Sequence, residues 1–289
     1  MKIEILISTI DAGIGKIPLV LLPPEKDLAY CISHQVTERR YLTLPEELRR
    51  PDVKVDQIAG RGLCRNRNNT LAMASGDVAL LADDDVRYRP AYLKALRDAF
   101  AADQDMAVAC FKIDTPPGDP EYKEYSENSY LLNKESCHYI STLEIAFRTE
   151  LIKERAIFFD ERFGLGSRLN SFGEEAVFIH DCIKAGLKVK FVPRYVVEHP
   201  AVSTIKGLKR FDTVNTVFKG AYDARRYGWK ACPAAFYDLV RYRSELAGEG
   251  KSGKAYMKER LQGAWYILRS GKTALVEPRR AAFDLEDSG

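Results

Sequence analysis

The stretch Ala79–Tyr88, "ALLADDDVRY", places three consecutive aspartates, Asp83, Asp84 and Asp85, directly after an apolar run. Adjacent carboxylates repel one another, and aspartate is depleted in strands. The preceding "DVALLA" has the composition of a buried strand, and Pro90 is a typical first residue of a helix. We therefore expect the aspartates at the C-terminal end of a strand, which is the edge where parallel sheets bind ligands.

The rest of the chain alternates between strand-like and helix-like segments. Strands are expected at the N-terminus, at 29–36, at 106–114 and as two short strands in "KVKFVP" and "YVVEH", with regular structure near 141–148. Helices are expected over 62–75, after Pro90 and over 174–185, and a long loop is expected between the first two strands. This pattern predicts an α/β fold with a mostly parallel sheet flanked by helices. The chain after residue 205 is predicted to be mainly helical.

Composition narrows the functional class. The 289 residues have a net charge of only +3, which gives no argument for nucleic-acid binding. Residues 205–280, however, contain 17 Lys and Arg against 7 Asp and Glu, a difference of +10. Six cysteines without a C-x-x-C pair and the absence of a signal-peptide pattern indicate reduced thiols and a cytoplasmic location. The apolar run at 17–24 is too short to span a bilayer.

The aspartate cluster has two interpretations. It is either a solvated turn that caps the following helix or a site for Mg²⁺ or Mn²⁺. These ions prefer oxygen ligands and share them with substrate phosphates, so one or two carboxylates at a strand end suffice. A divalent cation would also offset the repulsion between the carboxylates.

Two further candidates lie later in the chain. Glu174 and Glu175 follow a glycine-rich loop at the start of a predicted helix, where the helix dipole alone stabilises an acid by about 0.5 kcal/mol. Either acid could also act as a general base toward a hydroxyl group. His199 ends an extended apolar run, where it is either a structural residue or a neutral imidazole that ligates a metal.

Basic residues precede the aspartate strand. Arg61, Arg65 and Arg67 lie near a predicted helix start, either as a basic flank or as guanidinium groups that contact phosphate or the aspartates. By contrast, "GIGK" at 13–16 lacks the glycine spacing of a phosphate loop and runs into Pro18.

Taken in their order along the chain, these strands, helices and polar motifs resemble family 2 glycosyltransferases of the GT-A fold over about residues 1–202. The family pattern "G-L-S-x-x-R-N" corresponds to "GLCRNRN", with Arg67 and Asn68 as the Arg-Asn pair, and the aspartate motif corresponds to "LADDDV". The catalytic Glu-Asp motif falls on Glu174 and Glu175, and a histidine metal ligand falls on His199. The resemblance divides the chain into a GT-A domain at 1–204, with a nucleotide-sugar-binding half (1–114) and an acceptor-binding half (115–204), and a helical region at 205–289.

The resemblance also implies an activity and roles for residues. It implies inverting transfer from a nucleotide sugar, with a UDP-sugar as the expected donor, to a glycan or lipid-linked acceptor in polysaccharide or glycoconjugate biosynthesis. Glu175 is the expected base, with Glu174 as the alternative, and loop 164–173 is expected to shape the acceptor pocket and to move on binding. The implied contacts with the donor nucleotide come from Ser8, Thr9, His34, Arg67, Asp83 and Asp84. The implied ligands of Mn²⁺ or Mg²⁺ are Asp84, which is the preferred one, Asp85 and His199.

One departure leaves the nucleobase contact open. Family members place an acid near the end of the second strand, whereas this chain offers Ser33, His34 or Gln35 there. Two other functions also stay open, namely a catalytically silent nucleotide-sugar or glycan-binding scaffold and a metal-dependent nucleotidyltransferase. The basic, aromatic C-terminal region either packs on the catalytic domain or makes a peripheral contact with the inner face of the membrane.

Overall fold

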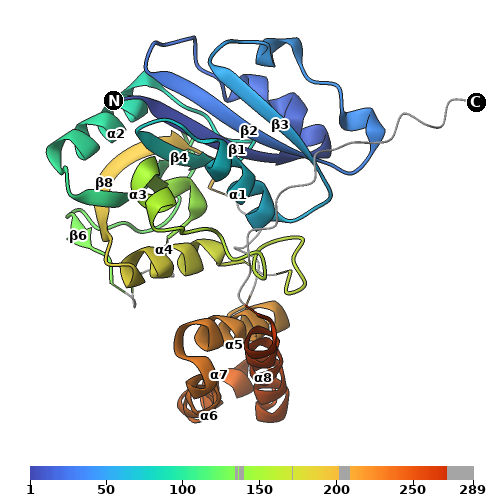
Figure 1. The fold of residues 1–289 in the computed structure, drawn as a ribbon. Helices are drawn as coiled ribbons and strands as arrows, with labels where there is room; N and C mark the ends of the chain where they lie inside the picture. Colours follow the sequence, from blue (N-terminus) through green and yellow to red (C-terminus); the bar gives the residue numbers. More distant parts are fainter. Residues whose placement is uncertain (134–135, 137–139, 171, 202–208, 272–289) are drawn as a thin grey trace, which may run out of the picture. The chain divides into compact units, whose positions relative to one another are not determined.

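The computed structural model describes residues 1–133, 136, 140–170, 172–201 and 209–271 (Figure 1). Within these residues the chain forms two compact units, the first from 1–159 and 175–201 and the second from 160–174 and 209–271. The assignment of 160–174 to the C-terminal unit was not expected.

The first unit is built on an eight-stranded sheet in the order β3-β2-β1-β4-β7-β5-β8-β6. Its strands are β1 (Ile3–Ile10), β2 (Leu28–Val36), β3 (Val53–Ala59), β4 (Val78–Ala82), β5 (Met106–Asp114), β6 (Tyr130–Leu131), β7 (Ile145–Arg148) and β8 (Lys188–Glu198). The β1–β2, β1–β4, β2–β3 and β5–β8 pairings are parallel, while β7 and β6 add antiparallel pairings. The α/β class is confirmed.

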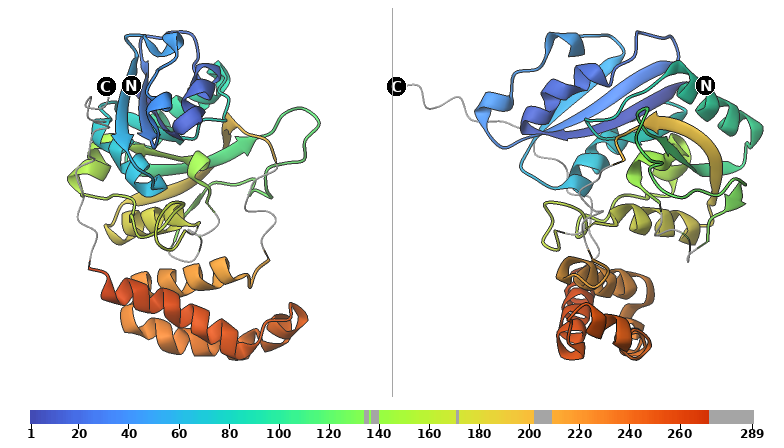
Figure 2. Two further views of the ribbon diagram at one scale, coloured as in Figure 1. Left: turned by 90° about the vertical axis from the view of Figure 1, so that its right-hand side faces the viewer. Right: turned by 180° about the vertical axis from the view of Figure 1, so that it is seen from behind.

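Helices cover this sheet. They are α1 (Leu63–Met73), α2 (Pro90–Ala102), α3 (Thr149–Glu154) and α4 (Glu174–Lys184), and the 3-10 helices are η1 (Asp11–Leu19), η2 (Arg39–Tyr41), η3 (Glu46–Leu48) and η5 (Thr142–Glu144). Helix α1 packs on β1 and β2, and α2 packs on β8 (Figures 1 and 2). The core is continuous from β1 to α2 and includes fully buried Ile5, Leu80, Leu93 and Phe111.

Three expectations of local structure were wrong. The segment expected as a long loop after the first strand contains η1, and β3 was not anticipated because its side chains are only partly buried. The predicted pair of short strands near residue 190 is one continuous strand, β8. Its pairing with β5 shifts register between Cys110, opposite Phe191, and Lys112, opposite Tyr195, so a bulge accommodates Pro193, which has no N–H to donate.

Two features of the sheet bring distant segments to its carboxyl edge. In the β1–β4 pairing, Ile7 lies opposite Ala82, so the residues that follow each strand are neighbours. At the end of β8, Glu198 pairs with Asp114 and also forms an isolated antiparallel bridge with Arg87. The chain after β4 is thus fixed to the end of β8.

The second unit is helical and comprises α5 (Thr213–Tyr227), η7 (Gly228–Lys230), α6 (Ala231–Arg241), α7 (Arg243–Gly248) and α8 (Gly253–Arg269). Helices α5 and α8 cross with their backbones in close contact, because a Cβ atom on Gly220 would lie 2.0 Å from the Arg260 carbonyl oxygen. Buried Arg260 donates to Asp223 at 2.6 Å and to Asp238 at 2.8 Å, so it joins α8 to both α5 and α6.

None of the helices in the described ranges is long and apolar enough to cross a membrane. Among the residues that the structure describes, Cys31, Cys64, Cys110, Cys182 and Cys232 form no disulfide bond.

The α5–α8 crossing predicts that Gly263→Ala destabilises the second unit. The new Cβ atom would lie 2.0 Å from the Val217 carbonyl oxygen, so the helices must separate at a cost of about 1–3 kcal/mol. Thermal unfolding followed by circular dichroism should show a lower midpoint. The matched control is Gly248→Ala, because its Cβ atom meets no atom within 4 Å. Equal midpoints for the two variants would contradict the prediction.

Candidate functional site

The three aspartates follow β4, and each contacts a different element of the first unit. Asp83 Oδ1 lies 3.5 Å from Arg67 Nη2 of α1. Asp84 accepts a hydrogen bond from Thr9 of β1, and Asp85 Oδ1 lies 3.5 Å from His199 Nε2 at the end of β8. The cluster thus brings together Thr9, Arg67 and His199 from the set that the sequence proposed. It also shows that the three carboxylates are not equivalent.

Both carboxylate oxygens of Asp84 have protein partners. The Thr9 hydroxyl donates to Oδ2 at 2.6 Å, and Lys16 Nζ lies 3.3 Å from Oδ1. Gly13 makes this arrangement possible, since a Cβ atom there would lie 2.1 Å from Asp84 Oδ2. Lys16 belongs to the "GIGK" stretch, which sequence analysis set aside as a phosphate loop. Its position after β1, beside the strand that ends in the aspartates, was the signal that could have identified it.

Asp85 and His199 form a pair with a defined tautomer. His199 Nδ1 lies 2.8 Å from the Pro200 carbonyl oxygen, which can only accept a hydrogen bond, so Nδ1 carries a proton. Nε2 therefore faces the Asp85 carboxylate, and Tyr122 packs edge-on against the imidazole ring at 5.8 Å. The hydrogen bond between the two groups raises the pKa of His199 and lowers the pKa of Asp85. Nε2 and the carboxylate thus share either a proton or another cation.

Helix α1 connects this cluster to two other segments. Asn66 donates to the Thr9 carbonyl oxygen at 2.9 Å. Asn68 donates to the Phe159 carbonyl oxygen at 2.9 Å and accepts from the Phe159 amide at 2.8 Å. Arg67, between them, is 3% exposed and also lies over the Phe159 ring. The Arg-Asn pair therefore links the aspartates to the residue that precedes loop 160–174.

The polar residues of β2 are engaged inside the protein. His34 is fully buried, with Nε2 2.9 Å from the Asp11 carbonyl oxygen and Nδ1 3.1 Å from Gln57. Burial lowers the pKa of His34, which favours the neutral ring. Gln35 donates to the Gly62 carbonyl oxygen, and Ser33 accepts from Asn69. His34 is thus placed to hold Asp11, and which residue would contact a nucleobase stays open.

Two other residues at this edge have separate roles. Asp11 adopts φ = 49°, an uncommon conformation for a residue other than glycine, and its carboxylate accepts hydrogen bonds from the backbone and side chain of Thr37. Ser8 is buried, and its hydroxyl has no hydrogen-bond partner among the residues that the structure describes. Asp11 therefore orders the segment after β2.

The two glutamates differ in accessibility. Both open α4, but Glu174 is 4% exposed and Glu175 is only partly buried. A general base must reach the hydroxyl of a bound substrate. Accessibility therefore favours Glu175 over Glu174, although the assignment itself stays a prediction.

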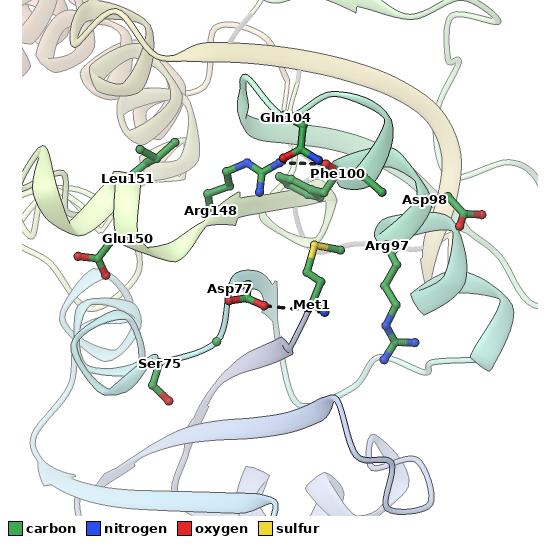
Figure 3. A pocket seen from close by; sticks show the side chains of 12 residues that line it. Met1, Ser75, Asp77, Arg97, Asp98, Phe100, Gln104, Arg148, Glu150 and Leu151 are labelled. Carbon is green, nitrogen blue, oxygen red and sulfur yellow. Dashed lines mark hydrogen bonds and ion pairs between the residues drawn. The ribbon is translucent and has the colours of Figure 1, made fainter.

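A separate cavity of about 620 Å³ lies at the opposite edge of the sheet (Figure 3). Met1, Asp77 and Arg148 are among its lining residues, and it opens near the amino ends of β1 and β4. Arg148 is already bound to backbone oxygens of Phe100 and Met106. This cavity contains none of the predicted site residues.

The match to a known protein family covers only part of the candidate site. Residues 41–164 match the family model described as Glycosyl transferase family 2. The resemblance to family 2 glycosyltransferases is confirmed. The match covers less than half of the chain and includes Arg67 and the three aspartates but not Glu174, Glu175 or His199. The roles of those three residues stay predictions. No curated protein sequence gives a significant match.

Solved structures of S. aureus TarS share the fold. TarS 1–349 is 18% identical with a TM-score of 0.53, and the match covers 69% of this chain and 60% of that one. Its complex with UDP-GlcNAc gives 14% identity, a TM-score of 0.57 and coverage of 78% and 66%. The complex of TarS 1–349 with UDP is 16% identical with a TM-score of 0.56, and the match covers 93% of this chain and 90% of that one. At this identity the comparison shows the fold alone, which is the GT-A fold.

The Asp85–His199 contact predicts a specific change in titration. Asp85→Asn should lower the pKa of His199 toward its ordinary value, because the amide no longer stabilises the imidazolium. NMR titration of the four histidines checks this shift. Asp84→Asn is the control and should leave the His199 titration nearly unchanged. A pKa for His199 that responds equally to both substitutions would contradict the observed pairing.

Proposed function

We propose that this protein is an inverting glycosyltransferase that moves a sugar from a nucleotide-sugar donor to an acceptor hydroxyl group. The observation that carries the proposal is the position of the aspartate cluster. In the order β3-β2-β1-β4, strands β2 and β3 are added on one side of β1 and β4 on the other. The point between β1 and β4, where the order changes sides, is where open α/β sheets bind nucleotides. Thr9, Lys16, Arg67 and the three aspartates all lie at the carboxyl ends of these strands.

A UDP-sugar is the proposed donor. Support comes from the shared fold of TarS, whose structures contain UDP-GlcNAc and UDP. In this chain, Lys16 and Arg67 provide positive charge beside Asp84 and Asp83. Lysine and arginine both bind phosphate oxygens, so the edge can receive a diphosphate despite its carboxylates.

We assign the metal site to Asp85 and His199. Two atoms that each lie about 2.2 Å from one ion can be up to roughly 4.4 Å apart, and these two are 3.5 Å apart. The Pro200 carbonyl also fixes the tautomer that leaves Nε2 available, as is usual for a metal-binding histidine. In this assignment Asp84 is a positioning residue held by Thr9 and Lys16, contrary to the expected order among the aspartates.

The described residues contain no group of three or more His, Cys, Asp or Glu side chains suited to a metal. Mn²⁺ and Mg²⁺ keep few protein ligands and also bind substrate phosphates, so the proposed site needs only these two side chains. A bound ion would offset the negative charge of the diphosphate.

The metal assignment predicts that added Mn²⁺ broadens the NMR resonances of His199 before those of the other three histidines. An unaffected His199 ring would contradict the assignment.

Glu175 is the proposed general base. Its carboxylate takes the proton of the acceptor hydroxyl while that oxygen attacks the anomeric carbon. The bond between this carbon and the diphosphate oxygen breaks on the opposite face, so the nucleoside diphosphate leaves with the bonding electrons and the configuration inverts. Arg67 and Lys16 hold positive charge where the leaving group develops its negative charge.

The base assignment predicts that Glu175→Gln lowers kcat for transfer by about 10²–10⁴-fold with donor affinity nearly unchanged. Transfer is measured as release of nucleoside diphosphate with a panel of UDP-sugars and acceptors in Mn²⁺, and affinity by calorimetry. Glu174→Gln is the matched control, with a smaller expected loss. Full transfer by Glu175→Gln would exclude Glu175 as the base.

The same donor panel separates the other functions. Saturable donor binding without transfer to any acceptor would support a binding scaffold, and exchange of pyrophosphate into a nucleoside triphosphate would support a nucleotidyltransferase. Failure of the wild-type chain to bind any nucleotide sugar would contradict the proposed function.

We further propose that the second unit makes a peripheral contact with an anionic membrane surface, where a lipid-linked acceptor would reside at the cytoplasmic face. Both tryptophans of the chain are exposed there, Trp229 at 71% and Trp265 at 56%. On α8, Leu261, Trp265 and Leu268 are exposed, and Lys254 and Lys258 are exposed nearby in sequence. Aromatic and cationic side chains together favour the membrane interface.

This contact predicts that the chain co-sediments with vesicles of phosphatidylglycerol and phosphatidylcholine but not with phosphatidylcholine alone. The double substitution Lys254→Glu/Lys258→Glu should weaken binding by at least about 30-fold, because each of the two lysines lost near such a surface contributes about 1 kcal/mol. The control Lys26→Glu/Lys184→Glu removes two exposed lysines of the first unit. Binding that is equally sensitive to both pairs, or a dimer that hides Trp265, would contradict the contact.

A further inference from the structure

One lysine is almost completely buried near the end of β5. Lys112 is 7% exposed and lies two residues before Asp114, the last residue of the strand. Lysine is rarely buried to this extent unless its ammonium group is paired with a carboxylate. Among the residues that the structure describes, however, no hydrogen bond or ion pair is formed by Lys112. Its positive charge is therefore not matched by a carboxylate of the described chain.

Two tyrosine rings contact the ammonium group of Lys112 instead. Its Nζ atom lies 4.5 Å from the centroid of the Tyr195 ring and 5.4 Å from the centroid of the Tyr125 ring. Such contacts stabilise a desolvated cation by about 2 kcal/mol, which offsets only part of the cost of burying a charge. They orient the ammonium group but leave its N–H donors unused. These donors can bind an anion from outside the protein.

The buried carboxylate beside Tyr125 is already bound to a different lysine. Glu144 is fully buried, and its carboxylate lies 2.8 Å from Lys123 Nζ. Its Oε1 atom also accepts a hydrogen bond from the Tyr125 hydroxyl at 2.7 Å, and Oε2 accepts from the Ser141 amide at 2.8 Å. Both oxygens of Glu144 are therefore engaged, and its charge is balanced by Lys123.

The ammonium group of Lys112 can be reached from solvent. Of the described side-chain atoms without a hydrogen-bond partner, those enclosed away from solvent do not include Lys112 Nζ. Tyr125 and Tyr195 are only partly buried, and the chain that follows Tyr125 is exposed from Ser126 to Ser129. A small anion can therefore approach Nζ.

Lys112 points to the face of the sheet that carries α4. Alternate side chains of a strand point to opposite faces. In β5, Phe111 packs in the core cluster that contains α2, so Lys112 points to the other face. Val108 shares that face and pairs with Phe147 of β7, whose ring contacts Phe178 of α4. Lys112 therefore lies on the face with the helix that opens with the proposed base.

The position of Lys112 suits the acceptor better than the donor diphosphate. Strand β7 separates β5 from β4, and neighbouring strands are about 4.8 Å apart, so β5 lies about 10 Å from the strand that leads into the aspartates. Tyr122 packs on the His199 ring at 5.8 Å, and Tyr125, three residues later, contacts Lys112. The segment between the two tyrosines thus runs from the proposed metal site to Lys112.

We propose that Lys112, oriented by Tyr125 and Tyr195, binds a phosphate or carboxylate group of the acceptor. The inference rests on the proposed function and deepens it, because it names the acceptor class as a sugar or glycan that carries an anionic group. The ammonium group donates charge-assisted hydrogen bonds to the oxygens of this anion. The bound anion in turn supplies the negative charge that the described chain lacks at Lys112.

Acetylation of lysines, followed by mass spectrometry, tests this site in the wild-type chain. The acetylation rate of each lysine is measured alone and with glucose, glucose-6-phosphate, glucuronate, inorganic phosphate or phosphatidylglycerol vesicles. We expect glucose-6-phosphate and glucuronate to slow acetylation of Lys112 at least about threefold, because a bound anion covers Nζ, and glucose to leave the rate unchanged. Lys94, an exposed lysine of α2 paired with Asp98, is the internal control.

Variants of the full chain test the charge itself. Lys112→Met keeps a side chain of similar length without the charge, Lys112→Arg keeps the charge, and Lys94→Met is the matched control. Calorimetry with glucose-6-phosphate is done with excess UDP, which occupies the donor site. We expect Kd to rise about tenfold in Lys112→Met, less than about threefold in Lys112→Arg and not at all in Lys94→Met. UDP affinity should be equal in all three variants.

Equal protection of Lys112 by inorganic phosphate and by glucose-6-phosphate would overturn the inference, since a free anion would then suffice. Protection by vesicles alone would assign the site to a lipid headgroup and overturn it as well. The same holds if Lys112 is never acetylated, which would show that it is sealed from solvent, or if Lys112→Met binds glucose-6-phosphate like the wild type. If Lys112→Met does not fold, acetylation of the wild type decides.

A different result would count against the proposed function. A wild-type chain that binds no nucleotide sugar contradicts the transferase, whereas protection of Lys112 by glucose-6-phosphate would still show an anion site. The two failures are therefore distinguishable.

Discussion

The placement of three adjacent carboxylates at the end of one buried strand is the constraint on which the rest of the first unit depends. Their mutual repulsion must be offset, and each carboxylate has a partner from a different element. Arg67 comes from α1, Thr9 and Lys16 from the end of β1 and the start of η1, and His199 from the end of β8. The sheet order that makes β1 and β4 neighbours therefore also brings Thr9 and Lys16 to Asp84.

Helix α1 connects the aspartate cluster to the backbone of Phe159. Arg67 contacts Asp83, the aspartate that we associate with the donor. Asn68 forms two hydrogen bonds with the backbone of Phe159. Beyond Phe159 the anchors of the chain come from α5 and α8, through Asp160, Arg162 and Gly173. The Arg-Asn pair thus links the aspartate cluster to the residue that leads into loop 160–174.

Sequence reasoning predicted most regular elements of the first unit but failed where burial was incomplete. Fully buried β5 was placed with its observed bounds, and α4 was placed within one residue, because their apolar patterns are strong. Partly buried β3 gave no such pattern, and the bulge beside Pro193 was mistaken for a break between two strands. Lys16 was missed because its motif was judged only as a phosphate loop, whereas it contacts Asp84 through space.

The sequence by itself determined the α/β class, the aspartate cluster at a strand end and the residues that could serve it, because periodicity and residue chemistry are local properties. Only the tertiary structure decided which aspartate pairs with which partner and that loop 160–174 belongs with the C-terminal helices. These assignments depend on strand register and helix packing between residues that are far apart in the chain. His199 lies more than a hundred residues from Asp85, and no local pattern encodes their 3.5 Å contact.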